Sequence, residues 1–253
     1  MDELIYKAKL AEHSGRFDDV VTIMKEVVHH SDKLTEDQRN LLNIGYRNVI
    51  WEKRAAWRLI YDVEVKELSR RKLKQAELAR EFRLVLEDEQ NAICKEVVEL
   101  IDSILANKGN DLESKVFLLK MKGDYYRYMA EYQSAGPNKT KYGTIAIENA
   151  EISYNKAKEI ANAEGMPSFH CVRLGLMLNI AVFTYEVKQD AVSAYNIAKD
   201  AFNTAVNDID NIEDEQYQNS LEIMQLIKDN ITIWMAERKE EIKEVAPPED
   251  ENV

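Results

Sequence analysis

Residues 39–58 read RNLLNIGYRNVIWEKRAAWR and give the clearest indication of the fold. Its apolar residues recur at spacings of three and four, which is the spacing of one face of an α-helix. Just upstream, Thr35 and Gln38 form a capping-box pattern, in which a hydroxyl and an amide satisfy the first backbone groups of a helix. The apolar pattern continues on both sides of the quoted residues. We therefore expect one long helix over residues 36–66.

The same apolar spacing extends over nearly the whole chain, in about nine segments separated by short breaks. A second long segment covers residues 72–106, and two such lengths fit stacked antiparallel hairpins. Before the terminal segment, only Pro137 and Pro167 interrupt helices. The sequence therefore predicts an all-α fold, with about nine antiparallel helices in a single layered domain over residues 1–240.

The last residues differ from the rest in composition. From Glu241 onward the chain is acidic, and Pro247 and Pro248 oppose a helix while little is available to bury. We expect residues 241–253 to be a disordered tail.

Charge and composition exclude several classes of function. The formal net charge of −12 would repel nucleic acid, and no segment reaches the roughly 18 apolar residues of a membrane span. Cys94 and Cys171 lack metal-type spacing, so neither a metal nor a cofactor is expected. The first residues form an amphipathic segment rather than a secretion signal. We expect a cytoplasmic protein, with the nucleus as a second compartment.

Within the opening stretch, Arg47, Arg54 and Arg58 fall within about 40° of one another around a helix. Guanidinium groups match phosphate oxygens in pairs of hydrogen bonds, so this stripe is a candidate phosphate site. The alternative is a solvated face whose arginines pair with neighbouring acids. A second segment, VFLLKMKGDYYRYMAE at residues 116–131, adds basic groups and a tyrosine at Lys120, Arg127 and Tyr128. Its alternative is tyrosines packed in a core.

Two further segments each place an asparagine on an apolar stripe. RLGLMLNIAVFTYEV, residues 173–187, carries Asn179, and IMQLIKDNITIW, residues 223–234, carries Asn230. Such stripes are usually plain core. An asparagine amide both donates and accepts hydrogen bonds, however, which suits binding the backbone of an extended peptide.

These four segments, together with KAKLAEHSGRFDDVV at residues 7–21, resemble the 14-3-3 family over residues 3–236. The resemblance implies a dimeric adaptor without catalytic activity, which binds phosphoserine or phosphothreonine segments of client proteins in a concave amphipathic groove. The phosphate would be bound by Arg47, Arg54, Arg127 and Tyr128, with Arg58 and Lys120 as flanking basic residues. The groove would be lined by Asn179, Asn230, Leu178, Val182, Glu186, Ile223, Leu226 and Trp234.

The resemblance also implies a homodimer or a heterodimer with a related chain. Its interface would contain Glu3, Leu10, Ser14, Arg16 and Asp19 of one chain, facing Lys74, Phe82, Val85 and Glu89 of the other. An Arg16 to Glu89 ion pair is expected between the chains.

The chain departs from the family pattern at Trp51-Glu52-Lys53, where family members usually have glycine, alanine and arginine. Trp51 lies about 40° from Arg47 around the helix, so it could border the groove and alter side-chain preference.

Two rival classes remain. Glu26 and His29 have the spacing of half a di-iron site, but no second copy accompanies them, which argues against an enzyme. A tetratricopeptide-like scaffold would also use paired helices, although no sustained 34-residue repeat is present. Such a scaffold would bind its ligands whether or not they are phosphorylated.

Overall fold

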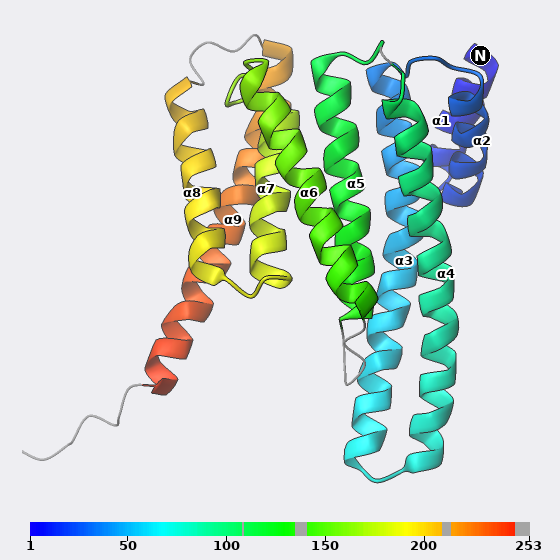
Figure 1. Ribbon diagram of the computed structural model, residues 1–253, viewed down its shortest axis with the longest axis vertical. Coiled ribbons are helices and arrows are strands. Elements are labelled where there is room, and N and C mark those ends of the chain that lie inside the picture. The colour runs from blue at the N-terminus through cyan, green and yellow to red at the C-terminus, as the bar shows by residue number, and fades with distance from the viewer. Residues whose placement is uncertain (108, 135–140, 209–213, 246–253) are drawn as a thin grey trace, which may run out of the picture. The chain divides into compact units, whose positions relative to one another are not determined.

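The computed structural model describes residues 1–107, 109–134, 141–208 and 214–245, and all of its regular secondary structure in these ranges is helical (Figure 1). The helices are α1 (Asp2–His13), α2 (Phe17–His29), α3 (Glu36–Ser69), α4 (Leu73–Leu105), α5 (Leu112–Gln133), α6 (Lys141–Ala163), α7 (Cys171–Glu186), α8 (Ala191–Asp208) and α9 (Asp214–Val245). The predicted all-α fold is confirmed.

The start of α3 shows why the helix begins where the sequence predicts. The Gln38 backbone N–H donates to the Thr35 hydroxyl at 3.3 Å, and the Thr35 N–H donates to the Gln38 side-chain oxygen at 2.9 Å. The predicted capping box is therefore confirmed. The chain turns back after Ser69 through Arg71, whose φ of 57° lies in the left-handed region and ends the helix. α4 then returns along α3 as the predicted hairpin (Figure 1).

The chain divides into two compact units, residues 1–157 and 158–253. The first unit is built around α3, which packs against α1, α2, α4 and α5. Its core is aromatic and aliphatic, with Tyr46, Ile50, Tyr125 and Tyr154 each 1% exposed. The division passes through α6, whose last turns belong to the second unit.

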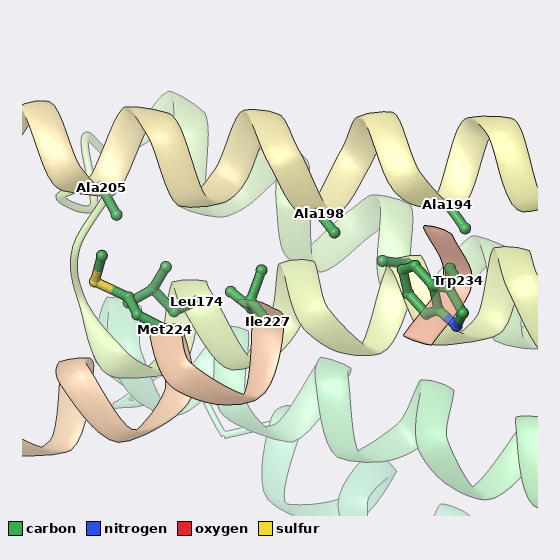
Figure 2. Packing of buried hydrophobic residues seen from close by; sticks show 8 residues of the cluster. Leu174, Ala194, Ala198, Ala205, Met224, Ile227 and Trp234 are labelled. Atoms are coloured by element: carbon green, nitrogen blue, oxygen red, sulfur yellow. The ribbon is translucent and has the colours of Figure 1, made fainter. Parts of the chain in front are cut away.

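The second unit packs α7, α8 and α9 against one another. Ala194, Ala198 and Ala205 line one side of α8 and are fully buried. Figure 2 shows these small side chains facing the larger Leu174, Met224, Ile227 and Trp234. Small residues on one helix let its neighbours approach closely, so the bulk of the core comes from α7 and α9.

The end of α9 differs from the predicted boundary of the tail. The helix continues through residues 241–245, which read EIKEV after Glu240 and contain good helix formers. It ends before Pro247, as expected of a helix approaching a proline. Residues 246–253 of the predicted tail lie outside the described residues. Within the described ranges, no helix has both the length and the hydropathy needed to cross a bilayer.

The close approach of α5 and α6 generates a first prediction. A Cβ atom added at Gly123 would lie 2.6 Å from the Tyr154 ring, so alanine cannot fit without displacing that side chain. Helix propensity favours alanine by about 1 kcal/mol, but overpacking costs about 1–3 kcal/mol. Three atoms of the Tyr154 ring would lie within 2.9 Å of the new Cβ, which places the overpacking cost at about 2–3 kcal/mol, so we expect Gly123→Ala to lower the free energy of unfolding by about 1–2 kcal/mol in urea denaturation.

Gly109→Ala is the matched control, because a Cβ there meets its nearest neighbour, the Asn107 side-chain oxygen, at an ordinary 3.5 Å. Equal stability of the Gly123→Ala variant and the unmodified chain would contradict the packing described here.

Candidate functional site

Two of the predicted arginines meet a carboxylate that joins α3 to α5. Arg54 Nε donates to Glu131 Oε2 at 2.7 Å, and Arg58 donates to Glu131 Oε1 at 2.5 Å. The Arg54 side chain is 8% exposed, whereas that of Arg58 is 48% exposed. The pairing with a neighbouring acid, which was the alternative interpretation, is thus present, but it leaves the two arginines side by side on one carboxylate.

Tyr128 brings the arginines of the two helices together. The Arg54 guanidinium carbon lies 4.1 Å from the centre of the Tyr128 ring, and that of Arg127 lies 4.8 Å from the same centre. Such cation–π contacts offset part of the repulsion between neighbouring cations. The Tyr128 side chain is half-buried, and its hydroxyl donates to no residue in the described part of the chain. The three groups form one cluster of donors.

A buried carboxylate, Asp124, contacts the basic residues of this cluster. It accepts a hydrogen bond from the Tyr154 hydroxyl at 2.6 Å and one from Lys120 Nζ at 2.9 Å, and it lies 3.8 Å from Arg127 Nη2. Burial by itself would raise the pKa of Asp124, but the charges of Lys120 and Arg127 and the hydrogen bonds from Tyr154 and Lys120 outweigh it, so the pKa is lowered. Asp124 therefore stays ionised and fixes Arg127.

Arg47 lies apart from these contacts. It is exposed and forms no ion pair with any residue that the structure describes. Trp51, one turn further along α3, is 59% exposed. The stripe predicted from the sequence thus has a buried middle at Arg54 and exposed ends at Arg47 and Arg58.

The balance of charge favours an anion. Lys120, Arg47, Arg54, Arg58 and Arg127 carry five positive charges, and Asp124 and Glu131 carry two negative ones, which leaves an excess of three on a chain whose net charge is −12. Guanidinium forks that are already oriented lose less entropy when they bind a phosphate. The arrangement is suited to a dianion.

The second unit holds the predicted groove residues on α7 and α9. Leu178, Val182 and Ile223 are partly buried against the core, whereas Leu226 is 51% exposed. The Asn230 amide donates to the Leu226 carbonyl of its own helix at 2.8 Å. Asn179 is half-buried and Glu186 is exposed.

Trp234 is the least exposed of the predicted groove residues. It is 5% exposed and stacks on Tyr185 with ring centres 4.9 Å apart. Its large apolar ring gains more by joining the core of the second unit than by lining an open surface (Figure 2).

The predicted dimer residues lie in the first unit, one group on α1, α2 and the turn between them and the other on α4, and most of them are exposed. Leu10, Phe82 and Val85 are 50%, 57% and 54% exposed. Residues on α1 and α2 enclose an open pocket of about 420 Å³, which is lined by Lys7, Leu10, Ala11, Ser14, Arg16, Asp19, Thr22 and Ile23. Glu3 and Lys74 are also exposed. Within one chain Arg16 pairs with Asp19, and Glu89 pairs with Lys53 at 2.6 Å.

Sequence reasoning missed the acids and the tyrosine that position the cluster. Asp124 and Glu131 lie three residues before and four residues after Arg127, and that helical spacing could have identified both. Tyr154 lies on α6, and no local pattern links it to Arg127.

Groups suited to catalysis are scarce around these residues. Burial raises the pKa of the Cys94 thiol to about 12, although the Arg54 charge opposes the shift, so this thiol is a poor nucleophile at neutral pH. In the described ranges, His, Cys, Asp and Glu side chains form no group that could hold a metal ion.

The sequence of this chain is also similar to those of known proteins. A family model described as "14-3-3 protein" matches residues 7–235. The chain is 42% identical to 14-3-3-like protein F of Nicotiana tabacum, over 99% of this chain and 97% of that protein. It is 41% identical to 14-3-3-like protein G-BOX factor 14 lambda of Arabidopsis thaliana, over 96% and 97% of the two chains.

The Asp124 contacts generate a prediction about stability and pH. Asp124→Asn removes a buried charge that Lys120 and Arg127 face, and we expect it to lower the free energy of unfolding at pH 7 by about 2–4 kcal/mol. Because the folded-state pKa of Asp124 is lowered, its contribution is present above the unfolded pKa of about 4 and is lost as the pH falls through the folded value. The deficit of the variant should therefore shrink below about pH 4 in denaturation experiments.

Asp62→Asn, at an exposed position of α3, is the control and should change stability little at either pH. A deficit that stayed constant from pH 7 to pH 3 would contradict the ionised state of Asp124.

Proposed function

Because this chain belongs to the 14-3-3 family, we propose that Arg54, Arg127 and Tyr128 bind the phosphate of its phosphorylated clients. The protein is an adaptor that binds phosphoserine or phosphothreonine segments and is not an enzyme. Because the chain belongs to the 14-3-3 family, the alternative function of a tetratricopeptide-like scaffold is not favoured. The proposal concerns which side chains carry out the binding and how.

One observation carries the proposal: two guanidinium groups lie within 5 Å of one tyrosine ring, 4.1 Å and 4.8 Å from its centre. Arg54 and Arg127 come from different helices, and the Tyr128 hydroxyl beside them is a third donor. A phosphate accepts hydrogen bonds through three oxygens, so three convergent donors suit it better than a carboxylate.

The carboxylates prepare the arginines for a phosphate. Glu131 accepts a hydrogen bond from Arg54 Nε and so orients the guanidinium group. The remaining N–H donors of Arg54 are then available to the ligand. Asp124 accepts a hydrogen bond from Lys120 and attracts Arg127 by charge across 3.8 Å, while Arg127 Nε donates to the Tyr154 hydroxyl at 3.4 Å. A phosphoserine carries nearly two negative charges at neutral pH, so it is attracted by the excess positive charge that two carboxylates leave in place.

Arg47 and Arg58 would then contribute less to the affinity for the phosphate than Arg54 and Arg127 do. Both are exposed, so the ion pairs that they form with a ligand are screened by water and salt. We assign them to attraction and to contacts with the flanking chain, and the larger share of the affinity to Arg54 and Arg127.

The second unit would bind the main chain of the client. In this proposal the Asn179 and Asn230 amides pair with peptide N–H and C=O groups. Asn230 donates to the Leu226 carbonyl, which leaves its side-chain oxygen as an acceptor for a client N–H. The apolar contacts come from Leu178, Val182, Ile223 and Leu226, next to Glu186. Trp234 supports this surface from within the core.

The chain is also proposed to pair with a second copy or with a related chain, with the exposed Leu10 of one chain against the exposed Phe82 and Val85 of the other. Burying apolar side chains contributes about 25 cal/mol per Å², whereas exposed ion pairs contribute about 0–1 kcal/mol. Apolar contact should therefore decide the association. The Arg16 to Glu89 pair between chains would replace the pairs that each forms within its own chain.

The charge of −12 favours proteins over nucleic acids or anionic membranes as partners. We place the protein in the cytoplasm, with the nucleus as a second compartment.

The phosphate proposal predicts a strong dependence on phosphorylation. A peptide with basic residues upstream of a phosphoserine should bind at least about a hundredfold more tightly than its unphosphorylated twin, because charged hydrogen bonds contribute roughly 1.5–3 kcal/mol each. Arg54→Ala and Arg127→Ala should each nearly abolish binding in fluorescence polarisation.

Arg80→Ala removes an exposed arginine of α4 outside the cluster and should leave the affinity unchanged. Circular dichroism of the three variants separates lost binding from lost folding. Equal affinity of the intact protein for the two peptides would contradict the proposed phosphate site.

The assembly proposal predicts a dimer at micromolar concentration whose stability depends weakly on salt. Phe82→Asp places a charge in the proposed apolar surface and should produce monomers in sedimentation velocity. Ile152→Asp, at a position of α6 that is 61% exposed, is the control and should sediment as the unmodified chain does. A monomeric unmodified protein would contradict the proposal.

A further inference from the structure

The three tryptophans of the chain occupy different environments. Trp57 and Trp234 are 4% and 5% exposed and belong to the cores of their units, whereas Trp51 is 59% exposed. Trp57 stacks on Tyr61, and its indole N–H donates to Glu87 at 2.9 Å. The Trp51 indole has neither a hydrogen bond nor a ring contact with any described residue. A large aromatic face is therefore open in the isolated chain.

Trp51 lies on the side of α3 that carries the proposed phosphate site. At about 100° per residue, it is about 20° from Arg58 and about 40° from Arg47 around the helix. The other exposed apolar residues of α3 are Leu59, Val63, Val65 and Leu68, at about 80°, 120°, 40° and 100° from Trp51 around the helix. Val65 shares the direction of Trp51 but lies about 21 Å further along the axis, so the nearest charged residues of the helix in that direction are the cations Arg47 and Arg58.

The distance along the helix places Trp51 within reach of residues that flank a bound phosphate. Trp51 and Arg54 are separated by about 4.5 Å along the axis of α3, and an extended peptide advances by about 3.3 Å per residue. A client whose phosphate lies on Arg54 would thus place a side chain one to three residues away against the indole.

Charge decides which kind of side chain fits there. Arg47 and Arg58 flank Trp51 on the same stripe, within a cluster that has an excess of three positive charges. A client arginine or lysine would meet these cations, and a carboxylate would cover the apolar ring with a group that prefers water. An aliphatic or aromatic side chain is not repelled by the cations and carries no charge that has to be desolvated.

We propose that Trp51 is a specificity-determining residue that selects phosphorylated clients with an apolar side chain within three residues of the phosphorylated one. The inference rests on the proposed phosphate site. Trp51 contributes little to phosphate affinity itself, because the indole offers a single donor and no charge.

The test uses the full chain and phosphoserine peptides with leucine, serine or arginine placed in turn at each position from −3 to +3. We expect one position at which the leucine peptide binds about tenfold more tightly than the serine peptide. In Trp51→Ala that ratio should fall below about twofold while the affinity for the serine peptide stays within about twofold. Trp51→Phe should keep part of the preference.

Ile152→Ala, at another exposed apolar position, is the control and should keep the full leucine preference. Three results would overturn the inference: equal leucine-to-serine ratios with and without Trp51, a preference for arginine that Trp51→Ala removes, or a dimer that Trp51→Ala dissociates. Failure of the phosphate site is recognised separately, because the unmodified chain would then bind phosphorylated and unphosphorylated reference peptides equally.

Discussion

The structure of the first unit depends on placing Arg54 and Arg127, two cations on different helices, beside one tyrosine ring in a place largely shielded from water. Like charges repel more strongly there than in bulk solvent, and a buried charge without a partner costs several kcal/mol. Glu131 and Asp124 meet this constraint, one for each arginine. Because each arginine lies beside a carboxylate, the two cations can stay close together before any ligand binds.

The positions of the two arginines depend on the hydrogen bonds and the packing of neighbouring side chains. Asp124 is buried and accepts hydrogen bonds from the Tyr154 hydroxyl and from Lys120, and Tyr154 in turn fills the space that the missing Cβ of Gly123 leaves open. The phosphate site is therefore connected to the packing of α5 against α6. Toward solvent the same face of α3 ends in Arg47 and Trp51, which are free to meet the client rather than the core.

The sequence predicted the helices well because their signals are local. The capping box at Thr35 and the apolar spacing of α3 and α4 depend on residues three and four apart, and the arginine stripe depends on the same period. Features that depend on distant residues were harder to predict. Tyr154 reaches Asp124 from another helix, Trp234 joins the core because Tyr185 and α8 surround it, and the division into two units reflects contacts that no local pattern records.

The central claim is that one phosphate is held by Arg54, Arg127 and Tyr128 together. A crystal structure of the chain with a bound phosphoserine peptide tests it most directly. We expect phosphate oxygens at about 2.7–3.0 Å from both guanidinium groups and from the Tyr128 hydroxyl, with Glu131 still paired with Arg54 and Asp124 still beside Arg127. A phosphate bound elsewhere on the chain, or held by the exposed Arg47 and Arg58 without Arg54 and Arg127, would contradict it.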